Sequence, residues 1–126
     1  MRANPIKLKL RAGQPVIGTW QGLDCPGNAE ILADAGFEFI VFDLEHGHYT
    51  TTSLIACLDA VRRTDISPMV RVPANDTTIL KQVLEMGPEG VVIPMVCSKK
   101  EAEAAVASCK YPPAGIRGIG AGRASN

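Results

Sequence analysis

The chain has 126 residues, of which 46% are hydrophobic and 21% are charged, as is ordinary for one globular domain with a single core. Thirteen basic and thirteen acidic side chains cancel, so the chain lacks the long-range field that attracts nucleic acid or a membrane surface, and neither partner is expected. No apolar run reaches the roughly 18–20 residues that span a bilayer and the first ten residues lack a signal-peptide core, so a cytoplasmic location is expected.

Short apolar runs bounded by glycine, proline or charged residues predict four strands. They span residues 16–20, 37–43, 68–72 and 90–94. The second run is apolar on both faces after Phe39, which is typical of a strand buried on both sides in a parallel sheet.

Helix start and stop signals follow the first two strands. Asp24 is the predicted cap of a helix that has Pro26 in its first turn and stops at Gly36, where glycine can adopt the left-handed conformation. A second helix is predicted to open at Thr51 or Thr52.

Similar signals follow the last two strands. Asn75 or Asp76 is the predicted cap of a third helix that stops at Gly87. Ser98 and Glu101 have the spacing of a capping box and predict the start of a fourth helix. The Pro- and Gly-rich chain from residue 111 onward is predicted to be loop.

The alternation of strand and helix, repeated four times, predicts an α/β fold with a parallel sheet and right-handed crossovers. The expected strand ends at Trp20, Asp43, Arg71 and Pro94 lie 23, 28 and 23 residues apart, the spacing of βα units in a (β/α)8 barrel or an open doubly wound sheet. A complete barrel needs about 200–250 residues, so this chain has the length of half a barrel.

The four cysteines are scattered along the chain and form no Cys-x-x-Cys pair; they are Cys25, Cys57, Cys97 and Cys109. This spacing favours reduced and mostly buried thiols over a disulfide framework or a zinc site.

Polar residues follow directly on the most apolar strand, at the edge where parallel α/β folds bind ligands. A carboxylate from Asp43 or Glu45 and the imidazole of His46 could form an acid–base pair there, because a carboxylate can orient an imidazole and raise its basicity. In the alternative interpretation, Asp43 and Glu45 cap the next segment while His46 and His48 lie solvated on a loop. The residues alone leave both interpretations open.

Arg71 ends the third strand, and its guanidinium cannot lose its charge, so it needs an acceptor. The acceptor could be a substrate carboxylate or enolate. It could also be an internal carboxylate from Asp43, Glu45 or Glu85.

Trp20 and Glu85 are further candidates with structural alternatives. Trp20, the only tryptophan, can be explained as a packing residue in the core or at its rim. The position of Glu85 favours a solvated helix end over a catalytic acid. Residues 115–123 have the glycines of a phosphate loop but follow a helix instead of a strand, so a flexible loop with two arginines is expected.

Six segments resemble the HpcH/HpaI aldolase family, which comprises metal-dependent, pyruvate-type class II aldolases. They are residues 17–20 (IGTW), 29–37 (AEILADAGF), 43–46 (DLEH), 70–76 (VRVPAND), 93–96 (IPMV) and 111–118 (YPPAGIRG). The resemblance covers nearly all of the chain. It implies a (β/α)8 barrel of the phosphoenolpyruvate/pyruvate superfamily, of which residues 1–126 would be the N-terminal half with its first four βα units. It also implies a homo-oligomer, since full-length members of the family usually assemble as homo-hexamers.

The resemblance also implies roles for individual residues. His46 matches the catalytic histidine, and Arg71 matches the arginine that binds the substrate and polarises its pyruvyl oxygen. Trp20 matches an aromatic residue at the mouth of the substrate site, and Glu45 an acidic neighbour in the surroundings of the metal. Glu85 stands where several members have an aspartate that works with the histidine.

The implied cofactor is a divalent metal, Mg2+, Mn2+ or Co2+, whose direct ligands would end strands five and six, beyond Asn126. The implied reaction cleaves a 4-hydroxy-2-oxo acid to pyruvate and an aldehyde. Two alternatives stay open: a citrate lyase β-type or other pyruvate-superfamily lyase, and an inactive half-barrel that acts only by association. The Glu45-His46 pair and the segment 111–113 (YPP) favour the aldolase, and the 126-residue chain alone is expected to show no turnover.

Overall fold

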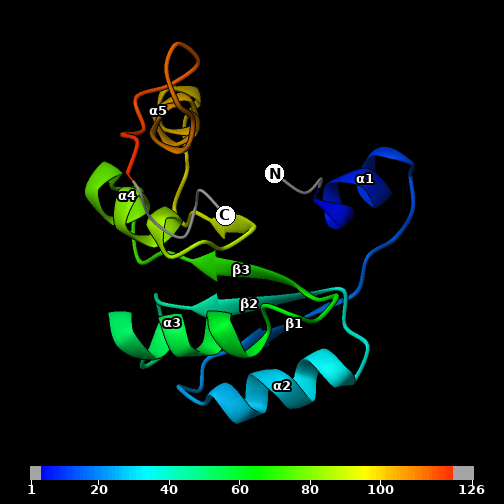
Figure 1. The fold of residues 1–126 in the computed structure, drawn as a ribbon. Coiled ribbons are helices and arrows are strands. Elements are labelled where there is room, and N and C mark those ends of the chain that lie inside the picture. Colours follow the sequence, from blue (N-terminus) through cyan, green and yellow to red (C-terminus); the bar gives the residue numbers. More distant parts are fainter. Residues whose placement is uncertain (1–3, 121–126) are drawn as a thin grey trace.

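A computed structural model describes residues 4–120, which form four βα units preceded by a short helix (Figure 1). The strands are β1 (Gly18–Gln21), β2 (Phe39–Asp43), β3 (Ser67–Arg71) and β4 (Gly90–Val92). The helices are α1 (Pro5–Arg11), α2 (Pro26–Asp34), α3 (Thr51–Ala60), α4 (Thr77–Glu85) and α5 (Lys99–Cys109). The predicted α/β alternation is therefore confirmed, with strand bounds that differ by up to two residues.

The four strands pair in parallel in the order β1-β2-β3-β4. Trp20 is level with Val41, Val41 with Met69, and Asp43 with Arg71. Side chains that are level in neighbouring parallel strands point to the same side of a sheet, and side chains two residues apart share a face. These five residues therefore lie on one face, which we call the site face.

The opposite face of the sheet carries the hydrophobic core. Ile40 and Phe42 from β2, together with Val70 from β3, are fully buried against the helices. Leu54 of α3 and Leu80 of α4 are fully buried in the same cluster. Figure 1 shows α2 and α3 side by side against the sheet. The helices thus cover one face, and the site face is on the other side.

Two of the predicted helix caps are confirmed by hydrogen bonds. Asp76 Oδ1 accepts from the backbone N–H groups of Thr78 and Ile79, each at 2.9 Å. Ser98 Oγ accepts from the N–H of Glu101 at 3.2 Å, but the Glu101 carboxylate accepts from Cys97 at 2.7 Å instead of completing the capping box at Ser98.

The predicted cap at Asp24 is wrong. The cap position of α2 is Cys25, which makes no side-chain capping bond, because the extended backbone continues one residue further before Pro26. For α3 the cap is Thr50, which forms a capping box with Ser53. The predicted stops are confirmed, since Gly36 and Gly87 have φ of 86° and 87° after the ends of α2 and α4.

The short helix α1 has no counterpart among the predicted elements. Asn4 caps it by accepting from the N–H of Lys7 at 2.9 Å, and none of its residues is buried. Lys9 forms an ion pair with Glu38, just before β2, and Asn4 Nδ2 lies 3.3 Å from a carboxylate oxygen of Glu89, just before β4. These contacts attach α1 to the amino ends of the strands.

All four cysteines are free thiols. The expectation that most of them are buried is wrong: Cys57 is buried and Cys109 is half-buried, whereas Cys25 and Cys97 are exposed. The two exposed thiols lie just before α2 and α5, where the chain turns at the surface.

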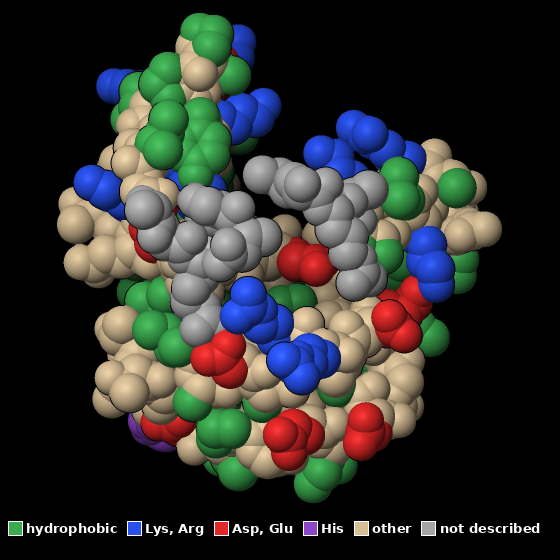
Figure 2. Space-filling view, viewed as in Figure 1, with side chains coloured by type: hydrophobic (Ala, Val, Ile, Leu, Met, Phe, Trp, Pro, Cys, Tyr) green, Lys and Arg blue, Asp and Glu red, His purple; other side chains and the backbone are tan. Residues whose placement is uncertain are grey.

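The loop expected after α5 is confirmed for residues 111–120, and the rest of it, including Arg123, lies outside the described residues. Figure 2 shows hydrophobic side chains exposed along α5 and charged side chains of both signs over the rest of this view. None of the helices between residues 4 and 120 is both long and apolar enough to cross a bilayer.

Candidate active site

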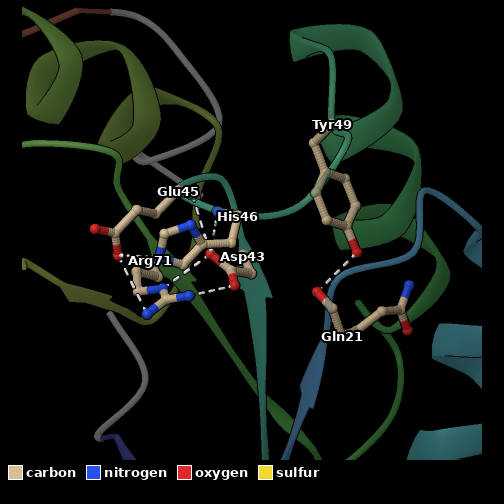
Figure 3. Close-up of polar contacts among 6 residues, drawn as sticks. All are labelled: Gln21, Asp43, Glu45, His46, Tyr49 and Arg71. Carbon is tan, nitrogen blue, oxygen red and sulfur yellow. Dashed lines mark hydrogen bonds and ion pairs between the residues drawn. The ribbon is translucent and has the colours of Figure 1, made fainter.

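A partly buried ion pair joins the carboxyl ends of the two central strands. Arg71 Nε donates to Asp43 Oδ1 at 2.8 Å, and Arg71 Nη2 binds Asp43 Oδ2, so the contact is bidentate (Figure 3). The pair forms because β2 and β3 end level with each other on the site face. The Asp43 side chain is only 8% exposed, so one edge of the guanidinium is fixed in a largely dry environment.

Asp43 also organises the loop that follows β2. Its Oδ1 accepts from the backbone N–H groups of Glu45 at 3.0 Å and His46 at 3.2 Å. The hydrogen bond from Arg71 is the main cause that holds the pKa of Asp43 far below its ordinary value; burial opposes it, and the two amides add to it. Asp43 is therefore a permanent anion at neutral pH and is not a proton donor.

The path of this loop depends on Gly47. A Cβ atom at Gly47 would collide with the backbone carbonyl oxygen of Asp43 and come within 3.0 Å of the carbonyl oxygen of Gly22. His48 follows in the same turn, and its N–H donates to the Gly22 carbonyl at 3.4 Å. The close approach of the backbone explains why a glycine follows His46.

Glu45 lies between the arginine and the histidine. Its Oε2 is 3.1 Å from Arg71 Nη1 and 3.7 Å from His46 Nε2. The Glu45 side chain is 20% exposed and that of His46 is 70% exposed, so the imidazole stands at the open side of the cluster. In Figure 3 the side chains of Asp43, Glu45, His46 and Arg71 converge at this point.

Trp20 covers the face of the guanidinium. Arg71 Cζ lies 5.0 Å from the centroid of the indole ring, a cation–π distance. Hydrogen bonding to Asp43 is the main cause that raises the pKa of Arg71, so its charge is permanent. The half-exposed Trp20 ring is thus neither a core residue nor free at the surface.

A second network ties the site loop to β1. The hydroxyl of Tyr49 donates to the carbonyl oxygens of Gln21 at 3.1 Å and Leu23 at 2.6 Å. The buried Gln21 side chain donates to the carbonyls of Leu23 and Cys25 at 2.9 and 3.1 Å. Figure 3 shows the contact between Tyr49 and Gln21 beside the Asp43–Arg71 cluster. The cluster fixes the start of the loop, and the Tyr49 contact fixes its end.

Glu85 does not join the cluster. It lies at the end of α4, where its Oε1 is 3.4 Å from Arg117 Nη2. Arg117 also donates to the Leu84 carbonyl at 3.3 Å and stacks on the Tyr111 ring at 4.7 Å. The structure thus brings together Trp20, Asp43, Glu45, His46 and Arg71 of the predicted site and places Glu85 in a separate ion pair.

Two residues of this arrangement were not singled out from the sequence as partners of the site. Gly47 had a usable signal, since a glycine after a strand and a charged pair marks a tight turn. Arg117 as the partner of Glu85 had none, because the pairing requires the chain after α5 to fold back on α4.

The carboxylates described here do not fit a divalent metal on their own. Within residues 4–120 there is no group of three or more His, Cys, Asp or Glu side chains that could hold an ion. Both carboxylates of the cluster are bound to Arg71, and Mg2+ or Mn2+ requires several oxygen ligands free for coordination. No chemical step is assigned to a metal at this cluster.

The fold and the cluster together define a half-barrel α/β protein with a candidate enzyme site at the carboxyl ends of its strands. The chain belongs to the HpcH/HpaI aldolase/citrate lyase family, whose family model matches residues 17–125.

Relatives and solved structures agree with this assignment. The chain is 43% identical over 118 residues to a pyruvate aldolase of Rhizobium etli, covering 94% of this chain and 46% of the relative. It is 42% identical over 123 residues to a 4-hydroxy-2-oxovalerate aldolase of Rhodococcus jostii, covering 97% and 48%.

A crystal structure of an HpcH/HpaI aldolase/citrate lyase family protein from Burkholderia cenocepacia superposes with a TM-score of 0.92 at 30% identity. The match covers 98% of this chain and 51% of that chain. The chain spans about half the length of the curated relatives it matches.

Proposed function

We propose that this chain supplies the acid–base and oxyanion-binding part of a pyruvate-type class II aldolase, which cleaves 4-hydroxy-2-oxo acids into pyruvate and an aldehyde. The observation that carries the proposal is a guanidinium fixed at the sheet edge beside an exposed imidazole. The names of the two relatives, a pyruvate aldolase and a 4-hydroxy-2-oxovalerate aldolase, support the substrate class.

The proposed reaction breaks the C3–C4 bond of the substrate. His46 takes the proton of the C4 hydroxyl, and the C4–O bond becomes the carbonyl of the released aldehyde. The electron pair of the broken bond passes to C3 and forms the enolate of pyruvate, which is then protonated at C3. The exposure of His46 supports this role, because the imidazole can reach a bound substrate and exchange its proton with water.

Arg71 is proposed to donate to the 2-oxo oxygen of the substrate, where negative charge develops as the enolate forms. Asp43 fixes one edge of the guanidinium and Trp20 covers its face, so little reorganisation is needed during the reaction. Trp20 is also proposed to line the mouth of the substrate site.

Two further roles concern the carboxylate that orients His46 and the ligands that hold the metal. Glu85 is bound to Arg117, so Glu45, at 3.7 Å, is the nearer carboxylate to orient His46. The divalent metal and the hexameric assembly implied by the family resemblance are proposals for the whole protein. The metal requires ligands other than the carboxylates of this cluster.

The test measures pyruvate release from 4-hydroxy-2-oxovalerate in the presence of Mn2+ or Co2+. It compares the full product of the reading frame that encodes residues 1–126 with the 126-residue chain. We expect turnover by the full product, a loss of about 10²- to 10⁴-fold in kcat for His46→Ala, and no turnover by the chain alone. His48→Ala is the matched control and retains activity.

Normal turnover by the full His46→Ala protein would remove His46 from the mechanism. A reading frame that ends after Asn126 and yields a folded, inactive monomer would contradict the enzyme proposal as a whole.

A further inference from the structure

Asp43 holds one edge of the Arg71 guanidinium in place, whereas the binding partner of the other edge can be exchanged. Asp43 binds Nε and Nη2, and Asp43 is itself buried and bound to two backbone amides. Exchange of this carboxylate would leave a buried charge without its partner, which is costly. Nη1 is therefore the group that can change its partner when a ligand arrives.

Glu45 is the present partner of Arg71 Nη1. Its Oε2 lies 3.1 Å from Arg71 Nη1, and its other charged neighbour is the exposed His46. The Glu45 side chain starts from a loop position next to solvent, so it can leave Arg71 without disturbing a strand. A carboxylate at this place has the charge and planar shape of the carboxylate or enolate of a 2-oxo acid.

The charge of the cluster leads to the same conclusion. Two carboxylates and one guanidinium give a net negative charge, which disfavours an incoming anion as long as Glu45 remains on Arg71. Once Glu45 leaves Arg71, the charges of Arg71 and Asp43 balance each other, and the free N–H of Nη1 can donate to a ligand oxygen.

We propose that Glu45 is an internal competitor for Arg71 Nη1, which a 2-oxo acid must displace in order to bind. This inference rests on the proposed function and deepens it, because it names the event that opens the site. Glu45 is thus a specificity residue: an anion binds only if it replaces a carboxylate already in place.

The test uses the purified chain and the fluorescence of Trp20, its only tryptophan, which stacks on Arg71. Oxalate, a planar analogue of the pyruvate enolate, and pyruvate are titrated at constant ionic strength. Four variants are compared with the wild type: Glu45→Gln, Glu45→Asp, Glu103→Gln and Arg71→Lys. Circular dichroism confirms that each variant is folded.

The variants separate local competition from overall charge. Glu45→Asp keeps the charge but shortens the side chain by about 1.5 Å, which is enough to break the contact with Nη1. Glu103→Gln removes one negative charge from the exposed face of α5, away from the cluster.

We expect Glu45→Gln and Glu45→Asp each to bind oxalate roughly two- to fivefold more tightly than the wild type, the effect of removing a partly exposed ion pair. Glu103→Gln should bind like the wild type, and Arg71→Lys should lose the signal.

The outcomes distinguish the two proposals. If Arg71→Lys loses binding but Glu45→Asp binds like the wild type or more weakly, Glu45 is not a competitor and the proposed function stands. If no protein binds oxalate or pyruvate in an Arg71-dependent way, this inference fails, whereas the proposed function is decided by the turnover of the full product and its His46→Ala variant.

Discussion

Asp43 has no direct part in the proposed proton transfer, yet three groups depend on it: the Arg71 guanidinium and the amides of Glu45 and His46. Asp43 fixes Arg71, the proposed oxyanion donor, and the loop that carries His46, the proposed base, so it would act through other residues. Its removal should therefore be visible in stability as well as in activity.

We predict that Asp43→Asn lowers the free energy of unfolding by about 2–4 kcal/mol, because Arg71 loses a charged partner in a mostly buried place. The folded-state pKa of Asp43 lies below its ordinary value of 3.8, so its contribution is fully present above that value. The difference between wild type and variant should stay constant from about pH 8 to pH 5 and shrink as the pH falls below about 4.

Urea unfolding at a series of pH values checks this prediction. The exposed Asp65 provides the control, since Asp65→Asn should change stability little. A difference for Asp43→Asn that grows on acidification would show that the aspartate is not the stabilising anion of the pair.

At the scale of elements, the loop between β2 and α3 is the most constrained segment near the site. Gly47 lies against the Asp43 carbonyl, and Tyr49 attaches the end of the loop to β1. Because His46 lies between Asp43 and Gly47 in this loop, the loop geometry fixes the position of the backbone that carries the imidazole.

We predict that Gly47→Ala costs about 1–3 kcal/mol, since the new methyl group overlaps the backbone and the loop must move. Gly27→Ala in α2 is the matched control: a Cβ there meets nothing within 4 Å, and alanine in a helix should be neutral or stabilising by up to about 1 kcal/mol. Thermal unfolding compares the two, and equal melting temperatures for Gly47→Ala and wild type would mean that the loop tolerates the overlap.

The elements that were predictable are those with strong periodicity or a local capping signal. The apolar run after Phe39 marked β2, and Asp76 and Ser98 marked two helix starts through bonds within three residues. Helix α1 was missed because it buries no side chain, so it leaves no apolar stripe in the sequence.

The candidate site likewise has contacts that could be predicted from the sequence and contacts that could not. The meeting of Asp43 and Arg71 follows from strand ends in parallel register, so it could be expected from the sequence. The choice of Asp43 and Glu45 over Glu85 as partners of Arg71 could not, because it depends on Arg117 folding back to bind Glu85. The exposure of Cys25 was likewise hidden, since the extended backbone, rather than residue type, decides where α2 begins.

At the scale of the whole molecule, the sheet has two open edges within residues 4–120. β1 pairs only with β2, and β4 pairs only with β3. Large apolar side chains are exposed near these edges, including Ile17 at 67% and Met95 at 82%. Open strand edges next to exposed apolar surface favour pairing with another chain.

We therefore predict that the purified 126-residue chain self-associates as its concentration rises. Sedimentation velocity over a hundredfold concentration range would show an increase in average mass. Ile17→Lys, which places a charge beside the β1 edge, should reduce the association. A strictly monomeric wild-type chain at high concentration would show that both edges are protected in solution.

The level placement of Asp43 and Arg71 has a consequence for folding as well. Side chains alternate between the two faces of a strand, so a slip of β3 by one residue against β2 would turn Arg71 toward the helices. Its charge would then enter the apolar core, while Asp43 would be left beside a valine. The same two side chains thus disfavour the wrong alignment of the sheet, so the ion pair also specifies the register of β3 against β2.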